Sequence, residues 1–243
     1  MKERKKKAKK QAGAGGRKRK TPEQARRRAA RTVRQPFSRE DWISAARVEL
    51  IAAGVNAVKV GLLARRMRVT RGSFYWHFTG QADLLLDLLK SWEHTSTVSF
   101  ERVLTAGESR NGPAEFLAFA SLWIKETEFM PAYDTAVRDW ARTSREAAAA
   151  VRRVDQRRID VLHRIFKDLG FAGPEALVRA RITYFHQIGY YAIDMQEDPE
   201  RRRALVPVYL QVLSGLPMDL IVSTLAKAGA GQGPAESAAA PAI

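Results

Sequence analysis

The 243-residue sequence predicts an all-α fold, and three observations support this prediction. From Pro36 onward, apolar residues recur at steps of three and four, which is typical of amphipathic helices. Glycine and proline separate these periodic stretches, as they do where helices begin and end. No alternating apolar and polar run bounded by turn residues indicates a β-strand.

The first helix is expected between residues 38 and 54. Ser38 and Asp41 resemble a capping box, and Gly54 stands where a glycine commonly ends a helix. Between these signals, a stripe that should face the core is formed by Ile43, Ala46, Leu50 and Ala53.

Two short helices should follow, over residues 60–67 and 70–78. The first of them has Val60, Leu63, Ala64 and Met67 at helical spacing. The second begins at Thr70, a residue type that favours helix N-caps, and the gap at Arg68 and Val69 allows only a tight turn. A longer helix followed by two such helices is the outline of a helix-turn-helix.

Longer helices are expected beyond Gly80. Pro113, Pro131 and Pro174 stand where a first-turn proline is favoured, since its missing N–H would be unpaired there in any case. The expected ranges are 82–104, 113–129, 131–142, 144–169, 174–195, 201–213 and 217–227. The alanine-, glycine- and proline-rich residues 228–243 are expected to form a flexible tail.

The positive charge is concentrated at the N-terminus. Residues 1–34 carry 16 Lys and Arg against Glu3 and Glu23, a net charge of +14 out of +16 for the whole chain. So basic a segment, poor in large apolar residues, is expected to be disordered when free and to bind a polyanion. Nucleic acid is the expected partner rather than a membrane surface, because residues 5–20 contain no aromatic or large aliphatic side chain. A merely solubilising tail remains the alternative.

Several classes of function find no support in the sequence. The absence of cysteine excludes disulfides, thiolate metal sites and cysteine nucleophiles. The longest stretch without a charge, residues 204–218, is too short to span a membrane, and no apolar signal segment occurs in the first 35 residues. The four histidines lack metal-ligand spacing, and no nucleophile elbow or phosphate loop is present. We therefore expect a cytoplasmic protein that is not an enzyme and has no catalytic residues, cofactor, metal or membrane partner.

The third helix presents two different faces when its residues are placed at steps of 100°. Phe74 and Phe78 share one side, with Tyr75 at its flank, and should anchor the helix to its neighbours. The opposite side carries Gly72, Ser73, Trp76 and His77. An exposed Trp beside a glycine indicates a contact surface. The alternative is that residues 75–78 form an aromatic core cluster.

DNA suits this surface chemically. We expect Thr70 and Arg71 to meet a phosphate, Ser73 and Trp76 to reach base edges or thymine methyl groups, and Tyr75 and His77 to hydrogen-bond phosphate oxygens. One alternative is a nucleic-acid coating protein that binds through its basic arm alone. A helical ligand carrier or enzyme is the other, and no motif supports it.

Residues 43–84 resemble the TetR family of bacterial regulators, most specifically in the uninterrupted run Val-Thr-Arg-Gly-Ser-Phe-Tyr-Trp-His-Phe at residues 69–78. The resemblance implies a ligand-responsive repressor that binds a palindromic operator as a homodimer. By the same resemblance, the DNA contacts are Gly61, Thr70, Arg71, Gly72, Ser73, Tyr75, Trp76 and His77.

The sequence departs from the family pattern at three positions. Lys59 replaces the usual Ser or Thr cap, Arg68 the usual turn glycine, and Gln81 a frequent Lys or Arg. Arg68 should then adopt a positive φ or reshape the turn. Gln81 implies one fewer phosphate contact, for which Lys59 could compensate.

The composition of the two ends, together with the two domains that the resemblance implies, predicts the domain organisation. Residues 1–35 are the basic arm, 36–80 the helix-turn-helix domain, 81–227 an effector-binding and dimerisation domain, and 228–243 the tail. Ligand binding would shift a population of domain arrangements and so weaken operator binding. The last long helices would pair across a two-fold axis as a four-helix bundle, near Ala192, Leu205, Tyr209 and Val212.

Candidate residues for an effector pocket are aromatic or polar side chains of the second domain, with a plain hydrophobic core as the alternative. They are Phe116, Phe119, Trp123, Trp140, His163, Phe166, Tyr184, His186, Gln187 and Tyr190.

Overall fold

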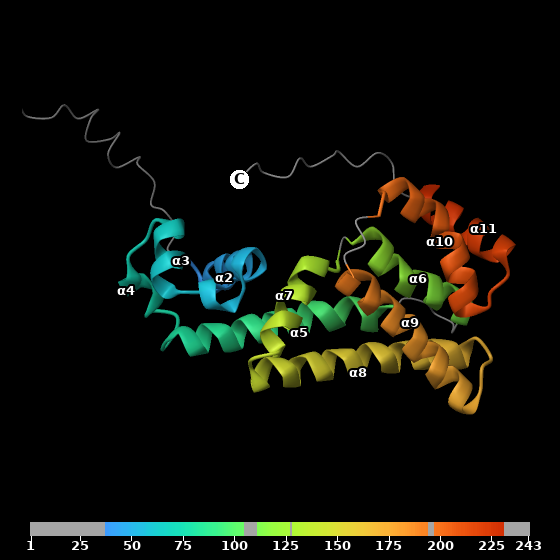
Figure 1. Ribbon diagram of the computed structural model, residues 1–243, viewed down its shortest axis with the longest axis horizontal. Helices are drawn as coiled ribbons and strands as arrows, with labels where there is room; N and C mark the ends of the chain where they lie inside the picture. Colours follow the sequence, from blue (N-terminus) through green and yellow to red (C-terminus); the bar gives the residue numbers. More distant parts are fainter. Residues whose placement is uncertain (1–36, 105–110, 127, 194–196, 231–243) are drawn as a thin grey trace, which may run out of the picture. The chain divides into compact units, whose positions relative to one another are not determined.

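The computed structural model describes residues 37–104, 111–126, 128–193 and 197–230. Within these ranges all regular structure is helical, which confirms the all-α prediction (Figure 1). The described residues from Ser38 onward form one compact unit. The predicted basic arm, residues 1–35, and the tail beyond Ala230 lie outside the described residues.

The helices follow the order that the sequence pattern predicts. Their bounds are α2 Arg39–Ala53, η1 (a 3-10 turn) Val55–Ala57, α3 Val60–Met67, α4 Arg71–Phe74, α5 Gln81–Arg102, α6 Gly112–Lys125, α7 Pro131–Ala141, α8 Arg145–Asp168, α9 Gly173–Ile193, α10 Pro199–Ser214 and α11 Met218–Ala230. Most ends agree with the expected ranges to within a few residues. The largest differences are at the ends of α4 and α6, which stop four residues early: α4 continues as turns after Phe74, and α6 stops where Glu126 adopts a left-handed φ of 52°.

Side-chain caps explain several helix starts. The Ser38 hydroxyl accepts from the Asp41 N–H, and the Asp41 carboxylate accepts from the Ser38 N–H, so the predicted capping box at the start of α2 is confirmed. Asn111, Ser144 and Asp198 accept equivalent bonds at the starts of α6, α8 and α10.

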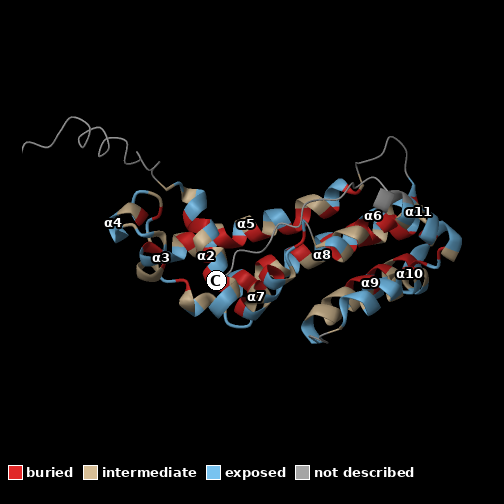
Figure 2. Cartoon of the chain, turned by 90° about the horizontal axis from the view of Figure 1, so that it is seen from above, coloured by how far each residue is buried: buried red, intermediate tan, exposed pale blue. Residues whose placement is uncertain are grey.

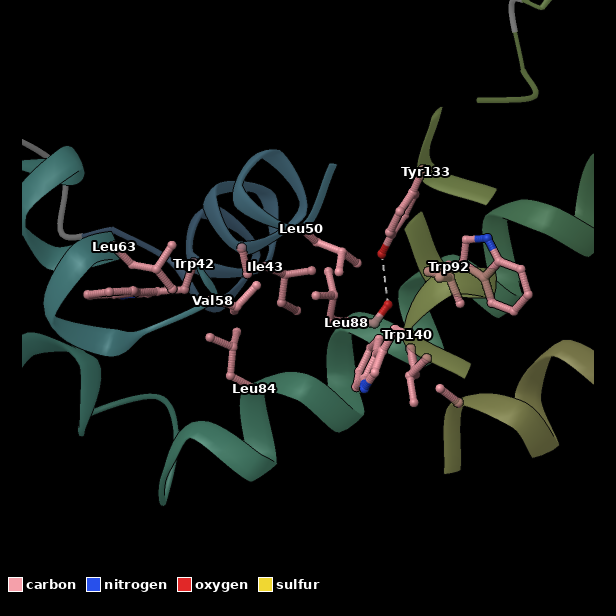
Figure 3. Packing of buried hydrophobic residues seen from close by; sticks show 14 of the residues in the cluster. Trp42, Ile43, Leu50, Val58, Leu63, Leu84, Leu88, Trp92, Tyr133 and Trp140 are labelled. Carbon is pink, nitrogen blue, oxygen red and sulfur yellow. Dashed lines mark hydrogen bonds between the residues drawn. The ribbon is translucent and has the colours of Figure 1, made fainter. Parts of the chain in front are cut away.

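One hydrophobic cluster joins the first three helices to α5, α7 and the start of α8. Buried stretches run along α2, α5 and α7 (Figure 2). Trp42, Leu88 and Trp92 are among the buried residues of this cluster (Figure 3). The Tyr133 hydroxyl of α7 donates to the Leu88 carbonyl over 2.9 Å, which ties α7 to the middle of α5. Trp42 was missing from the predicted stripe of α2, whereas Ala53, which was included in it, is exposed.

A second cluster is built from α6, α8, α9, α10, α11 and the end of α5. Its centre is aromatic: Phe100 of α5 lies 4.9 Å from Phe119 and 5.7 Å from Trp123, centroid to centroid. Both clusters therefore contain residues of α5, which begins directly after the expected domain boundary at residue 80 and packs with helices on either side of it in sequence.

Candidate functional site

The turn between α3 and α4 is held by a residue in the left-handed conformation. Arg68 has φ 57° and ψ 44°, so the expectation of a positive φ in place of glycine is confirmed. The Val69 N–H donates to the Ala64 carbonyl over 2.9 Å and closes the end of α3. The two short helices are thus fixed in a tight turn.

Two phenylalanines anchor the segment that begins with α4. Phe74 and Phe78 are buried and stack at 5.1 Å, and the ring of Trp42 meets Phe74 edge-on at 5.2 Å. Trp76, by contrast, is 86% exposed and Tyr75 is 63% exposed. Tyr75 and Trp76 therefore do not belong to an aromatic core cluster, which was the alternative for residues 75–78.

Ser73 has its hydroxyl proton already engaged. Its Oγ donates to the Thr70 carbonyl over 2.7 Å, which leaves the lone pairs of that oxygen as the groups available to a ligand. Thr70 itself makes no side-chain cap. Toward a base edge, Ser73 would consequently act as an acceptor.

Gly61 and Arg71 are packed against each other. A Cβ added at Gly61 would lie 2.6 Å from a terminal nitrogen of the Arg71 guanidinium, so any side chain there would displace it. Gly61 thus makes room for the cation that begins α4. This contact relates the starts of α3 and α4, and sequence spacing alone did not indicate it.

Four exposed cations lie in the segment that contains α3 and α4. Residues 51–82 contain no acidic residue. Within the described part of the chain, no ion pair forms at Lys59, Arg65, Arg68 or Arg71, whereas Arg66 pairs with the buried Glu49 at 2.6 Å. The result is a positive surface beside the exposed Tyr75 and Trp76.

Gln81 has a structural contact within the same unit. Its Nε2 donates to the Val58 carbonyl over 2.7 Å and so connects the first turn of α5 to the loop before α3. Gln81, which stands where the TetR pattern frequently has Lys or Arg, therefore helps to position α5 relative to the loop before α3.

A cavity of about 70 Å³ lies between α6, α9 and α10. Of the ten residues expected to line an effector pocket, six line this cavity: Phe116, Phe119, Trp123, His186, Gln187 and Tyr190. Sequence reasoning missed the contributions of Thr183, Arg202 and Leu213. Tyr209, which is expected near a dimer seam, also borders the cavity, and its ring lies 4.9 Å from that of His186.

The other four expected pocket residues lie elsewhere. Phe166 is fully buried in the second hydrophobic cluster, and Trp140 belongs to the first and borders a separate surface hollow. His163 is partly exposed on α8. Tyr184 is buried behind the cavity wall, against Trp123.

A buried ionic network joins α7, α8 and α9. The Tyr184 hydroxyl donates to Asp155 over 2.6 Å, Arg138 bridges Asp155 and Asp134, and the fully buried Arg158 contacts Asp134 at 3.2 Å. Burial raises the pKa of Tyr184, so its hydroxyl stays protonated and keeps donating. The sequence analysis did not predict this network. The available signal was the spacing of Asp155 and Arg158, which lie three residues apart in a strongly periodic helix.

The described residues contain neither a metal-binding cluster nor a membrane-spanning helix. Among them, no group of three histidine, aspartate or glutamate side chains is arranged to hold a metal ion. No helix in the same ranges has the length and apolar character needed to cross a bilayer.

Comparison with known families identifies the helix-turn-helix. A family profile described as "Bacterial regulatory proteins, tetR family" matches residues 43–88, the segment from α2 into α5. Residues 43–88 therefore form a DNA-binding domain of the TetR type. The TetR resemblance of residues 69–78 is thereby confirmed.

Two curated HTH-type transcriptional regulators are similar to about a quarter of this chain. The HTH-type transcriptional regulator SrpR of Pseudomonas putida is 36% identical over 63 residues, which is 26% of this chain and 30% of SrpR. The uncharacterized HTH-type transcriptional regulator TtgW, from a strain of the same species, is also 36% identical over 63 residues, or 47% of its length. The match thus spans less than half of either relative.

Solved structures share the fold over most of the chain. A TetR-family regulator of Streptomyces coelicolor, SCO4454, has a TM-score of 0.58 at 17% identity and covers 84% of this chain and 94% of its own. NemR of E. coli, in its reduced form, has a TM-score of 0.55 at 16% identity, with 81% and 99% covered. The TetR architecture of an N-terminal helix-turn-helix followed by a helical domain is therefore present here.

Proposed function

We propose that this chain is a sequence-specific DNA-binding transcriptional regulator, a ligand-responsive repressor that acts in the bacterial cytoplasm and on the nucleoid without catalytic chemistry. The observation that carries the proposal is Trp76, 86% exposed on a segment anchored by buried Phe74 and Phe78. So large an apolar side chain in water, beside unpaired cations, favours a role in contact with DNA.

Roles at the DNA follow from the positions of the side chains. Ser73 and Trp76 read base edges or thymine methyl groups, while Lys59, Arg71, Tyr75 and His77 meet phosphates. Thr70 and the two glycines, Gly61 and Gly72, let the backbone approach the duplex closely.

A second copy of the chain is the proposed partner of α9 and α10. Exposed apolar residues follow one face of these helices: Val178, Ile182, Phe185, Ile193, Val208 and Val212. An isologous contact between two such faces would form a four-helix bundle. It would present two recognition segments to major grooves about 34 Å apart, which requires a palindromic operator. Val212→Glu should yield monomers in analytical ultracentrifugation, whereas a persistent dimer would contradict this arrangement.

The basic arm is proposed to add affinity without sequence preference. Residues 1–34 carry a net charge of +14, enough to release many counterions from DNA. Their deletion should flatten the salt dependence of binding while leaving the preferred site unchanged. Loss of the site preference on deletion would indicate that the arm itself reads the sequence.

The decisive experiment changes the recognition segment. A DNA site that the wild-type protein binds is selected from a random-sequence pool, and the affinity of the protein for this site is compared with its affinity for shuffled DNA. Arg71→Ala combined with Trp76→Ala should abolish the difference, with the melting temperature unchanged because both side chains are exposed. Arg152→Ala, at an exposed position of α8, is the control. Retained preference in the double variant would refute the proposal.

A further inference from the structure

The wall of the cavity between α6, α9 and α10 contains buried polar atoms without partners. Within the described residues, nothing hydrogen-bonds to Nε1 of Trp123, Oγ1 of Thr183 or Nε2 of Gln187. All three residues line the cavity, and Trp123 and Thr183 are only 4% and 3% exposed. A buried donor without an acceptor destabilises the fold, so such a group in a native protein calls for an explanation.

The indole N–H can only donate, and the amide nitrogen likewise donates, so the missing groups are acceptors. A hydroxyl can donate to the same acceptor. These donors come from two helices, α6 and α9. A ligand oxygen held between the two helices would satisfy them together.

The rest of the cavity favours an uncharged, apolar ligand. Phe116, Phe119 and Leu213 supply apolar surface. Burial lowers the pKa of His186, so its imidazole is neutral at physiological pH.

The charged residues near the cavity carry opposite signs and are engaged with protein groups. Arg202 pairs with Glu126 at 3.0 Å, and Glu197 accepts from the Tyr190 hydroxyl over 3.3 Å. A ligand of either charge would meet a like charge at this cavity.

The volume restricts the ligand further. The cavity measures about 70 Å³, whereas an engineered cavity that admits benzene measures about 150 Å³. A molecule with a single ring therefore fits only if α9 or α10 moves outward. These are the helices with the exposed apolar face, so a ligand of this size would alter that face.

We propose that the cavity binds compact, uncharged molecules with one ring and an adjacent hydrogen-bond acceptor, such as aromatic ketones and esters. The inference rests on the proposed function, because it names the chemical class of the effector. The proposed cavity prefers ligands with a carbonyl oxygen, because this acceptor pairs with the donors of Trp123, Thr183 and Gln187.

The test measures binding to the full-length protein in the absence of DNA. Acetophenone is compared by ligand-observed NMR titration with α-methylstyrene, in which a CH₂ group replaces the carbonyl oxygen, and with benzoate. Acetophenone should bind about tenfold more tightly than α-methylstyrene, because a hydrogen bond to otherwise unpaired donors is lost in the latter. Benzoate should bind most weakly. Equal affinity for the ketone and the alkene, or tightest binding of benzoate, would overturn the proposal.

Two variants locate the preference in the cavity. Thr183→Val and Gln187→Met keep the side-chain size and remove the unpaired polar atoms. Each should reduce the preference for acetophenone severalfold and raise the melting temperature of the free protein, a combination that a purely structural role would not produce. Gln156→Met, on the exposed surface of α8, should change neither. An undiminished ketone preference in both cavity variants would contradict the assignment.

This outcome is separable from that of the proposed function. Carbonyl-dependent binding that leaves operator affinity unchanged would support the cavity chemistry and refute the ligand response. Conversely, selective operator binding without any carbonyl preference would leave the DNA-binding proposal in place.

Discussion

Arg39, in the first turn of α2, donates from Nε to Oδ2 of Asp87 on α5 over 2.7 Å. The same guanidinium lies 4.1 Å from the centre of the Phe78 ring, donates to the His77 carbonyl and reaches Asp83 at 3.2 Å. One side chain thus connects the first helix, the end of the recognition segment and the helix shared by both hydrophobic clusters.

Replacing this residue should weaken operator binding more than it weakens the fold. Arg39→Ala removes the contacts that hold residues 77 and 78, and we expect at least a tenfold loss of operator affinity in fluorescence anisotropy. Because the Arg39 side chain is 39% exposed, solvent screening limits the loss of unfolding free energy to about 1 kcal/mol. Asp87→Ala should act similarly, and in a double-mutant cycle the two effects should not add. Full additivity would show that the pair is not coupled.

Two glycines of the proposed DNA-binding surface should respond differently to alanine. In Gly61→Ala, the new Cβ displaces the Arg71 guanidinium. In Gly72→Ala, it meets nothing closer than the Thr70 hydroxyl oxygen at 3.7 Å, so the free protein accommodates it. Both variants should keep or raise the melting temperature, since alanine favours helix by up to about 1 kcal/mol.

The difference lies in the response to DNA. Gly61→Ala should lower affinity for all sequences and reduce the slope of log affinity against log salt by about one, as expected if the Arg71 phosphate contact is lost. Gly72→Ala should lose affinity only if the DNA backbone or a base comes close to that residue. Unchanged binding by Gly72→Ala would remove Gly72 from the interface.

The left-handed turn gives a stability prediction with an internal control. Arg68→Gly should raise the free energy of unfolding by about 1 kcal/mol, because glycine adopts φ 57° without steric strain. Arg65→Gly, within α3, should lower it by about the same amount. Chemical denaturation measures both. A destabilised Arg68→Gly variant would mean that the arginine side chain contributes more than its backbone strain costs.

Acid should weaken the contact between the recognition segment and α5. The Thr79 N–H hydrogen bond, together with Arg39, lowers the pKa of Asp83 below its ordinary value of 3.8. A carboxyl whose pKa is lowered in the folded state stabilises the protein above the unfolded pKa, and this contribution is lost as pH falls through the folded value. The melting temperature of the wild type should therefore drop below about pH 4.

Asp83→Asn should start from a lower melting temperature at pH 7 and show a shallower decline in acid. Thr79→Val, which keeps the backbone N–H and removes only the 3.3 Å hydroxyl contact, should retain most of the wild-type decline. An identical acid profile for Asp83→Asn would contradict the assignment.

The fold was largely predictable because the signals that begin and end its helices are local in sequence. Helix ends are defined within one turn by Ser38, Gly54 and the first-turn prolines. Apolar periodicity predicts the helical segments between these ends. The recognition segment was predictable in its two faces but not in its length. Its last residues are held by Phe78 and Arg39, and such tertiary contacts do not require a continuous α-helix.

The cavity was only partly predictable, for a related reason. Periodicity identifies an inward face, but it does not say whether that face meets a tightly packed neighbour or a void. Phe166 and Phe116 lie on inward faces alike, yet only Phe116 borders the cavity. The unpaired state of Thr183 depends on what stands opposite, which a single sequence does not reveal.

The length of α5 allows a small movement at one end of the helix to become a larger movement at the other. Its 22 residues span about 33 Å, with Leu84 and Leu88 held in one hydrophobic cluster and Phe100 in the other. As a rigid lever that pivots at its Phe100 end, it would need a rotation of only about 5° to displace its other end by about 3 Å. In a two-fold dimer the two displacements add, against a groove repeat of about 34 Å. A small rearrangement of the rings around Phe100 would thus be enough to change the spacing of the two recognition segments, so that they no longer match successive major grooves.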